Sequence, residues 1–91
     1  MSLIYILEDD KNIQEIERYA IKGNGYDVCA FDDAGAFDRG MQERKPDLLL
    51  LDVMLPGEDG LSVLKRLRSN SDTKELPVIL VTAKDSEIDT V

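Results

Sequence analysis

The chain has 91 residues, of which 43% are hydrophobic and 33% charged, and its formal net charge is −8. This composition fits one domain with a packed core, whereas the acidic balance argues against contact with nucleic acid or an anionic membrane surface, which both need a basic face. Because no apolar stretch approaches the roughly 20 residues of a membrane span and no signal peptide is evident at the N-terminus, we expect a cytoplasmic protein.

Strands and helices are predicted to alternate along the chain. Short apolar runs bounded by turn formers predict buried strands at residues 3–7, 26–31, 48–51 and 78–81. Helical spacing predicts one helix at 12–22, a second that opens at 32–33 and stops before 45–47, and a third at 61–68. The alternation implies an α/β fold, a doubly wound parallel sheet with helices on both faces.

Local signals refine these elements. Asn12 and Glu15 have the spacing of a capping box at the start of the first helix, and Ser86 and Asp89 indicate the start of a further helix. The helix residues expected to face the core are Ile13, Ile16, Ala20, Ala34, Phe37, Met41, Leu61, Leu64 and Leu67. The single Cys29 is expected to be a small buried group. Since histidine is absent, any chemistry rests on carboxylates, hydroxyls, amines or a bound ion.

Polar residues that could form a site follow the first, third and fourth predicted strands, whereas Asp32 and Asp33 after the second are expected to open a helix. Glu8, Asp9 and Asp10 follow the first strand, Asp52 follows the third, and Thr82 follows the fourth. Ligands of parallel sheets bind just beyond the carboxyl ends of the strands, so we expect these side chains to meet in one crevice. Two carboxylates about 4 Å apart repel by about 1–4 kcal/mol, and Mg²⁺ relieves such repulsion while accepting phosphate oxygens.

Asp52 has two possible roles in that setting. Its carboxylate can ligate Mg²⁺ or attack phosphorus to give an aspartyl phosphate, and the backbone carbonyl of Met54 can add a further oxygen ligand. The Thr82 hydroxyl and the N–H groups of Val53 and Ala83 can donate to phosphoryl oxygens. Taken singly, the acids also suit helix N-termini or turns, and Thr82 also suits a strand. Their conjunction at successive strand ends favours the functional interpretation.

The sequence resembles the receiver domain of two-component response regulators along its whole length. The matching stretches are ILEDD at 6–10, PDLLLLDVMLPG at 46–57, GL at 60–61 and PVILVTA at 77–83. The resemblance implies a flavodoxin-like fold with strand order 2-1-3-4-5. It also implies a bacterial signalling domain rather than an enzyme, phosphorylated by a sensor histidine kinase. Its change of shape would control an output domain, and the match is most similar to regulators with a winged-helix DNA-binding domain that controls transcription.

The resemblance also implies a role for each matching residue. These roles are direct Mg²⁺ ligation by Asp9, Asp52 and the Met54 carbonyl, water-mediated ligation by Glu8, phosphate acceptance by Asp52, a switch hydroxyl on Thr82 and a backbone amide donor at Ala83. Met54 and Lys84 match positions that tune the lifetime of the phosphoryl group. The resemblance implies that the domain would catalyse only its own phosphorylation, on Asp52.

The family pattern does not continue beyond these stretches. We expect a receiver domain truncated to residues 1–91, with strand order 2-1-3-4 and without the fifth strand, its phosphate-binding Lys and the last helices. The fourth strand would then be an unpaired apolar edge, which favours a homodimer, and one face of strands three and four would lose its cover. The alternative is a phosphorylation-impaired fragment that acts only as an interaction module.

Two other functions are possible on this kind of sheet. A metal-dependent phosphatase resembling haloacid dehalogenases would carry Asp-x-Asp, but the second residue after Asp52 is Met54. A nucleotide or flavin binder would place Gly or hydroxyl residues after the first strand, where this chain has three carboxylates. Both are less favoured than the signalling domain.

Overall fold

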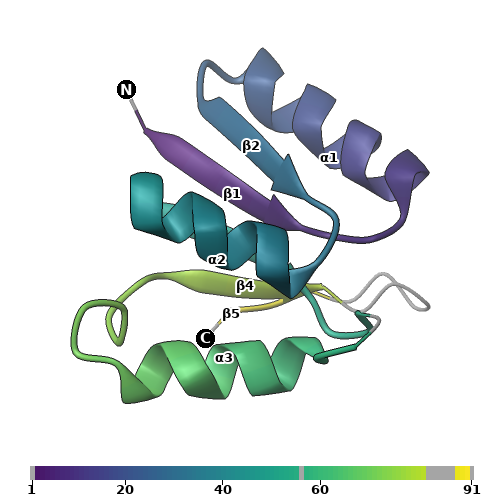
Figure 1. Ribbon diagram of the computed structural model, residues 1–91. Coiled ribbons are helices and arrows are strands. Elements are labelled where there is room, and N and C mark those ends of the chain that lie inside the picture. The colour runs from purple at the N-terminus through teal and green to yellow at the C-terminus, as the bar shows by residue number, and fades with distance from the viewer. Residues whose placement is uncertain (1, 56, 82–87, 91) are drawn as a thin grey trace.

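Four parallel strands form the predicted sheet. The computed structural model describes residues 2–55, 57–81 and 88–90. Its elements are β1 (Leu3–Leu7), α1 (Lys11–Gly23), β2 (Asp27–Phe31), α2 (Ala34–Glu43), β3 (Leu48–Asp52), α3 (Gly60–Ser69), β4 (Val78–Val81) and β5 (Ile88–Thr90). The sheet order is β2-β1-β3-β4-β5, and β1 to β4 run parallel. The expected order 2-1-3-4 is therefore confirmed. Figure 1 labels β1, β2, β4 and β5 of this sheet.

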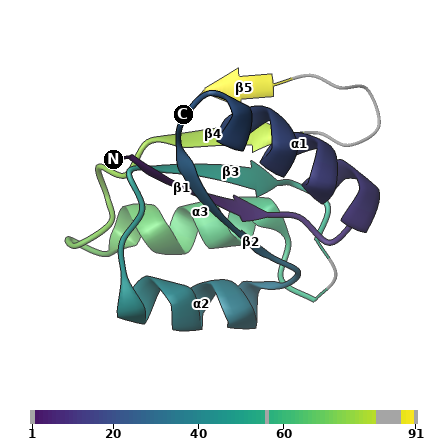
Figure 2. The same ribbon diagram turned by 90° about the horizontal axis from the view of Figure 1, so that it is seen from above.

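The helices form two layers, one on each face of the sheet. Figure 2 shows α2 and α3 on one side of the strands and α1 on the other. None of the helices in the described part of the chain is long and apolar enough to cross a membrane. The main core lies on the α2–α3 side and takes alternate residues of each strand; its buried members are Leu3, Tyr5, Leu7, Phe37, Leu49, Leu51, Leu55, Val63, Leu67, Val78 and Leu80.

Tyr5 joins β1 to the C-terminal end of α2. Its hydroxyl lies 3.0 Å from the carbonyl oxygen of Gly40 and 2.6 Å from that of Arg44. The Gly40 carbonyl also accepts from the Arg44 N–H at 3.0 Å, so the single hydroxyl hydrogen serves chiefly the Arg44 carbonyl at the C-cap of the helix. The ring is buried and packs edge-on against Phe31 and Phe37. One side chain therefore fixes α2 on the sheet and satisfies the end of that helix.

The opposite face of the sheet is only partly covered. α1 packs on β2 and β1, and the residues that point to this side from the other two parallel strands are half-buried: Leu48, Leu50, Ile79 and Val81. The expected loss of cover over β3 and β4 therefore takes the form of a half-buried apolar face.

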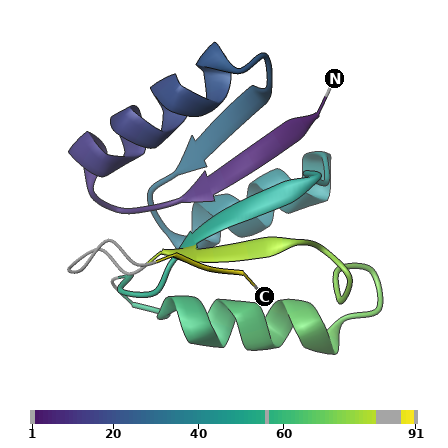
Figure 3. The same ribbon diagram turned by 180° about the vertical axis from the view of Figure 1, so that it is seen from behind.

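The prediction that β4 is an unpaired edge is wrong. Residues 88–90 form the short strand β5, which pairs antiparallel with β4 in the register Ile79–Thr90 to Val81–Ile88 (Figure 3). The pairing gives the outer backbone groups of β4 hydrogen-bond partners, which an edge strand lacks. Asp89 lies opposite Leu80 in this ladder, so it does not start a helix as its sequence context predicted. Ser86, the other half of that signal, lies outside the described residues.

Several side-chain predictions are also wrong, because they relied on helical spacing without knowing which side of the helix meets the sheet. Ile16 is 70% exposed and Leu61 is 55% exposed; α1 buries Gln14 instead, and α3 buries Val63 and Leu67. The predicted core residues Phe37 and Leu67 are confirmed as buried, and Ala34, Met41 and Leu64 pack against the same core. Cys29 is exposed because β2 is an edge strand.

We predict that Tyr5→Phe lowers the free energy of unfolding by about 1–2 kcal/mol, because the Arg44 carbonyl loses the Tyr5 hydroxyl as its donor in a partly buried site. Urea denaturation followed by circular dichroism measures the change. Tyr19→Phe is the matched control, since Tyr19 is 84% exposed. Equal stability of the two variants would contradict this role for the Tyr5 hydroxyl.

Candidate functional site at the carboxyl ends of the strands

Three acidic side chains meet where β1 and β3 end. Glu8 and Asp9 directly follow β1, and Asp52 is the last residue of β3. The two strands are neighbours in register, with Leu7 opposite Leu51. One carboxylate oxygen from each acid lies within 4.8 Å of the others. The structure thus brings together Glu8, Asp9 and Asp52 as the sequence predicted, at the end of the sheet to which the strand arrows point in Figure 1.

Glu8 is buried, with only 2% of the residue exposed. Its Oε2 accepts a hydrogen bond from the Asp10 N–H at 3.1 Å, while its Oε1 is buried without a hydrogen-bond partner among the described residues. Burial raises the pKa of Glu8 from its ordinary value of 4.5 to about 8, and the nearby charges of Asp52 and Glu17 act in the same direction. Among the described residues, no positive side chain forms an ion pair with Glu8.

Asp52 is equally buried and is held by the chain that follows it. The Met54 N–H donates to Asp52 Oδ1 at 3.0 Å, which orients the carboxylate. The Val53 N–H donates to the carbonyl of Val81 at 3.1 Å and so continues the β3–β4 ladder. The proposal that the Val53 N–H serves as a phosphoryl donor is therefore wrong, because this group is already used by the sheet.

Asp10 does not join the cluster. Its Oδ1 accepts hydrogen bonds from the N–H groups of Asn12 at 2.9 Å and Ile13 at 3.2 Å, so Asp10 is the N-cap of α1. The capping box expected at Asn12 is therefore wrong by two residues, since the N-cap is Asp10 and Asn12 already lies inside the helix. The acidic triplet after β1 thus divides into a cap, Asp10, and two residues of the site, Glu8 and Asp9.

Two residues of this region have roles that the sequence analysis missed. A Cβ at Gly60 would lie 2.2 Å from the Asp52 carbonyl oxygen and 2.7 Å from the Val53 Cα, so α3 can begin this close to the end of β3 only with glycine. Glu17, half-buried on α1, faces the same negative region: burial, and then the charge of Asp52, raises its pKa to about 7. A glycine at the start of a helix was visible in the sequence, but its contact with β3 was not.

Other predicted site residues lie outside the described part of the chain. These are Thr82, Ala83 and Lys84. Met54 is described, and its side chain is among the exposed large hydrophobic groups, while its N–H is engaged with Asp52.

The acidic cluster fits a small, hard divalent cation. Its donors are carboxylate oxygens from three residues, which is the ligand type that Mg²⁺ takes in proteins. A buried polar atom normally has a partner, and the orphaned Oε1 of Glu8 lies in this cluster. A cation or its bound water at this point would satisfy that oxygen and remove the mutual repulsion of the carboxylates.

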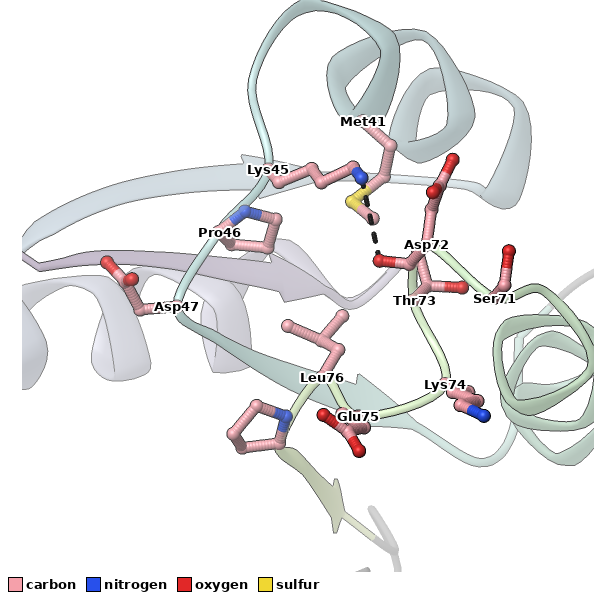
Figure 4. A pocket seen from close by; sticks show the side chains of 11 residues that line it. Met41, Lys45, Pro46, Asp47, Ser71, Asp72, Thr73, Lys74, Glu75 and Leu76 are labelled. Carbon is pink, nitrogen blue, oxygen red and sulfur yellow. Dashed lines mark hydrogen bonds between the residues drawn. The ribbon is translucent and has the colours of Figure 1, made fainter.

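A pocket at the opposite end of the sheet, where β3 and β4 begin, has a different set of charges (Figure 4). It has a volume of about 450 Å³ and is lined by the segments that precede β3 and β4. Its charges are mixed, with Lys45 and Lys74 beside Asp47 and Glu75. The Asp47 carboxylate already accepts a hydrogen bond from the Leu3 N–H at 2.8 Å. This pocket therefore has neither the single sign of charge nor the orphaned oxygen that marks the acidic cluster.

We predict that the metal-free protein loses stability as the pH rises from about 5 to about 8. Folded Glu8 keeps its proton up to about pH 8, whereas the unfolded chain releases it near 4.5, so the folded state binds more protons across this window. The stabilisation is complete below the unfolded pKa and is lost as the pH rises through the folded pKa. Urea unfolding in EDTA across this pH range measures the slope, and Glu8→Gln, which stays neutral, should have a shallower one. Identical slopes would refute the raised pKa.

Comparison with known proteins places the chain in a family. Residues 4–91 match the response regulator receiver domain model. The N-terminal domain of a response regulator receiver protein from Methanoculleus marisnigri JR1 is 26% identical with a TM-score of 0.86, over 92% of this chain and 68% of that one. The signal receiver domain of a signal transduction histidine kinase from Syntrophus aciditrophicus is 28% identical with a TM-score of 0.86, over 90% and 62%.

A third similar structure is the Mn(2+)-bound form of response regulator Rcp1, which is 27% identical with a TM-score of 0.84, over 96% of this chain and 69% of that one. The chain thus spans about two thirds of the length of these solved structures, between 62% and 69%. Because the family model matches nearly all of its residues, the chain belongs to the response regulator receiver domain family, whose members are signalling domains of two-component systems rather than classical enzymes.

Proposed function

We propose that this domain accepts a phosphoryl group on Asp52 from a sensor histidine kinase, in a reaction that depends on Mg²⁺. The observation that carries the proposal is the acidic cluster, in which the buried Glu8 has an oxygen without a partner beside the carboxylates of Asp9 and Asp52. The family match supports the same role. A domain of this kind turns over no small-molecule substrate beyond its own phosphorylation.

The cation would be held by oxygens from three segments. Asp9 and Asp52 would ligate it directly, the Met54 carbonyl would add a further oxygen, and Glu8 would act through a water. Similarity to the Mn(2+)-bound form of Rcp1 supports a divalent cation. When bound, Mg²⁺ neutralises charge on the phosphoryl oxygens.

Transfer to Asp52 needs a carboxylate that is oriented before the donor arrives. The Met54 N–H donates to one oxygen of Asp52. The start of α3 lies directly against the end of β3, where the Gly60 N–H donates to the Val53 carbonyl at 2.9 Å. In the proposed step a bond forms between a carboxylate oxygen of Asp52 and phosphorus. The phosphorus–nitrogen bond of the donor phosphohistidine breaks, and its electron pair stays on the imidazole. We propose the Thr82 hydroxyl and the Ala83 N–H as donors to the transferred group, with Met54 and Lys84 tuning its lifetime.

Phosphorylation would act through a change in shape that an output domain detects. The sequence most resembles regulators with a winged-helix DNA-binding domain, so we propose control of transcription in a longer protein. The net charge of −8 leaves DNA contact to that output domain, because phosphate backbones are bound by positive charge. The same charge suits a cytoplasmic domain that works away from anionic membrane surfaces.

We predict that Asp52→Asn abolishes acid-labile phosphorylation by a small phosphodonor such as acetyl phosphate in the presence of Mg²⁺, because the amide cannot supply the attacking oxygen. Intact-protein mass spectrometry measures the phosphorylated fraction.

Asp59→Asn is the matched control for this substitution. Asp59 caps α3 by accepting from the Ser62 N–H at 2.8 Å, and asparagine caps a helix about as well as aspartate. The control should therefore be phosphorylated like the unsubstituted domain. Persistent phosphorylation of Asp52→Asn, or none in the unsubstituted domain with Mg²⁺, would refute the proposed function.

A further inference from the structure

Gln14 occupies an unusual position in α1. It is the one described residue of this helix that is buried, with 5% exposed, although the helix also carries three isoleucines. An amide is buried in a protein only where its hydrogen-bonding groups have partners, because an unsatisfied buried donor is destabilising. The contacts of Gln14 therefore indicate why an amide is buried in this helix in place of one of its apolar side chains.

The Gln14 amide joins two loops that follow neighbouring strands. Its Nε2 donates to the carbonyl oxygen of Glu8 at 2.9 Å and to Asp32 Oδ1 at 3.0 Å, so both amide hydrogens are used. Glu8 follows β1, and Asp32 follows β2. On the solvent side, the Lys11 Nζ donates to the two carboxylate oxygens of Asp32 at 2.7 and 2.8 Å.

These contacts fix the backbone of Glu8 on both sides. The Glu8 N–H donates to the Phe31 carbonyl at 3.0 Å on the β2 side, and the Glu8 carbonyl accepts from Gln14 on the α1 side. The peptide groups around Glu8 thus have little freedom to rotate. Since Asp9 is the next residue, the same contacts set the positions of two of the three carboxylates in the acidic cluster.

We propose that Gln14, with Asp32 as its second acceptor, is a positioning residue that preorganises the cation site by holding the loop between β1 and α1. The inference rests on the proposed function, because it concerns the same Mg²⁺ site. Gln14 touches no atom of the cluster's carboxylates in the described contacts, so it acts through the backbone of Glu8. The exposed Lys11–Asp32 pair contributes little by itself, as surface ion pairs generally do.

The test is the Mg²⁺ affinity of Gln14→Met, measured by isothermal titration calorimetry. Methionine keeps the length and the helix propensity of glutamine but cannot donate to Glu8 or Asp32. We expect the dissociation constant for Mg²⁺ to rise about tenfold, the lower end of the effect of residues that orient metal ligands. Gln42→Met makes the same chemical change at an exposed position of α2 and should leave the affinity unchanged.

A second readout separates positioning from mere stability. The urea midpoint of each variant is measured without Mg²⁺, and the titration is run where every variant is folded. If Gln14→Met lowers the midpoint while its Mg²⁺ affinity equals that of the unsubstituted domain, Gln14 is only structural and the proposal is overturned. If the unsubstituted domain binds no Mg²⁺, the proposed function itself fails and the positioning role falls with it.

A second pair of variants carries the test if Gln14→Met does not fold. Asp32→Ala and Asp32→Asn remove the same charge, but only asparagine keeps an oxygen that accepts from the Gln14 amide. We expect Asp32→Ala to weaken Mg²⁺ binding about threefold relative to Asp32→Asn, a smaller effect than that of removing the donor itself. Equal affinities of the two variants would overturn the proposed link through Asp32.

Discussion

Repulsion between carboxylates that a parallel sheet forces together is the interaction on which the rest of this structure depends. Glu8 and Asp52 come from neighbouring strands in register, and Asp9 follows Glu8 directly. The chain cannot separate them without breaking the β1–β3 ladder. The conflict shows in Glu8: burial and the charge of Asp52 raise its pKa to about 8, and one of its oxygens has no hydrogen-bond partner among the described residues. A divalent cation would resolve both problems, since it would supply positive charge, and the cation or its bound water would occupy the lone pairs of the oxygens.

Much of the surrounding structure holds these acids in place rather than taking part in chemistry. Asp10 caps α1 and also gives its N–H to Glu8. Gly60 lets α3 begin against the backbone of Asp52, and the Gln14 amide ties the end of β1 to the loop after β2. Because each contact uses backbone groups or a helix terminus, the site is part of the fold itself. Substitutions that never touch the cation can therefore change its affinity.

The sequence predicted the fold, and it predicted that three acids would lie close together, because both depend on short-range patterns. Apolar runs located all four parallel strands, and the polar residues at their ends identified Glu8, Asp9 and Asp52. Prediction failed where the outcome depended on the rotation of a helix about its axis. Ile16 and Leu61 have the spacing of core residues but are exposed.

Sequence patterns also did not predict the pairing of β4 with β5. Ser86 and Asp89 have the sequence signal of a helix start, but residues 88–90 pair with β4 as a strand. The roles of Gln14 and Gly60 depend on what lies opposite each residue in space, and neighbours in sequence carry no such information. The buried acids were predictable because strand ends in a parallel sheet converge by geometry alone.

The most direct test of the central claim is a Mn²⁺ titration of the ¹⁵N-labelled domain, followed by ¹H–¹⁵N NMR spectra, since this paramagnetic ion broadens resonances near its binding site. If the three carboxylates form one cation site, the amide signals of Glu8, Asp9 and Val53 will broaden first, and Mg²⁺ will restore them by competition. Equal or earlier broadening at other acidic segments, such as Asp32–Asp33 or Asp72, would show that the acids of Glu8, Asp9 and Asp52 do not act as one site and would contradict the account.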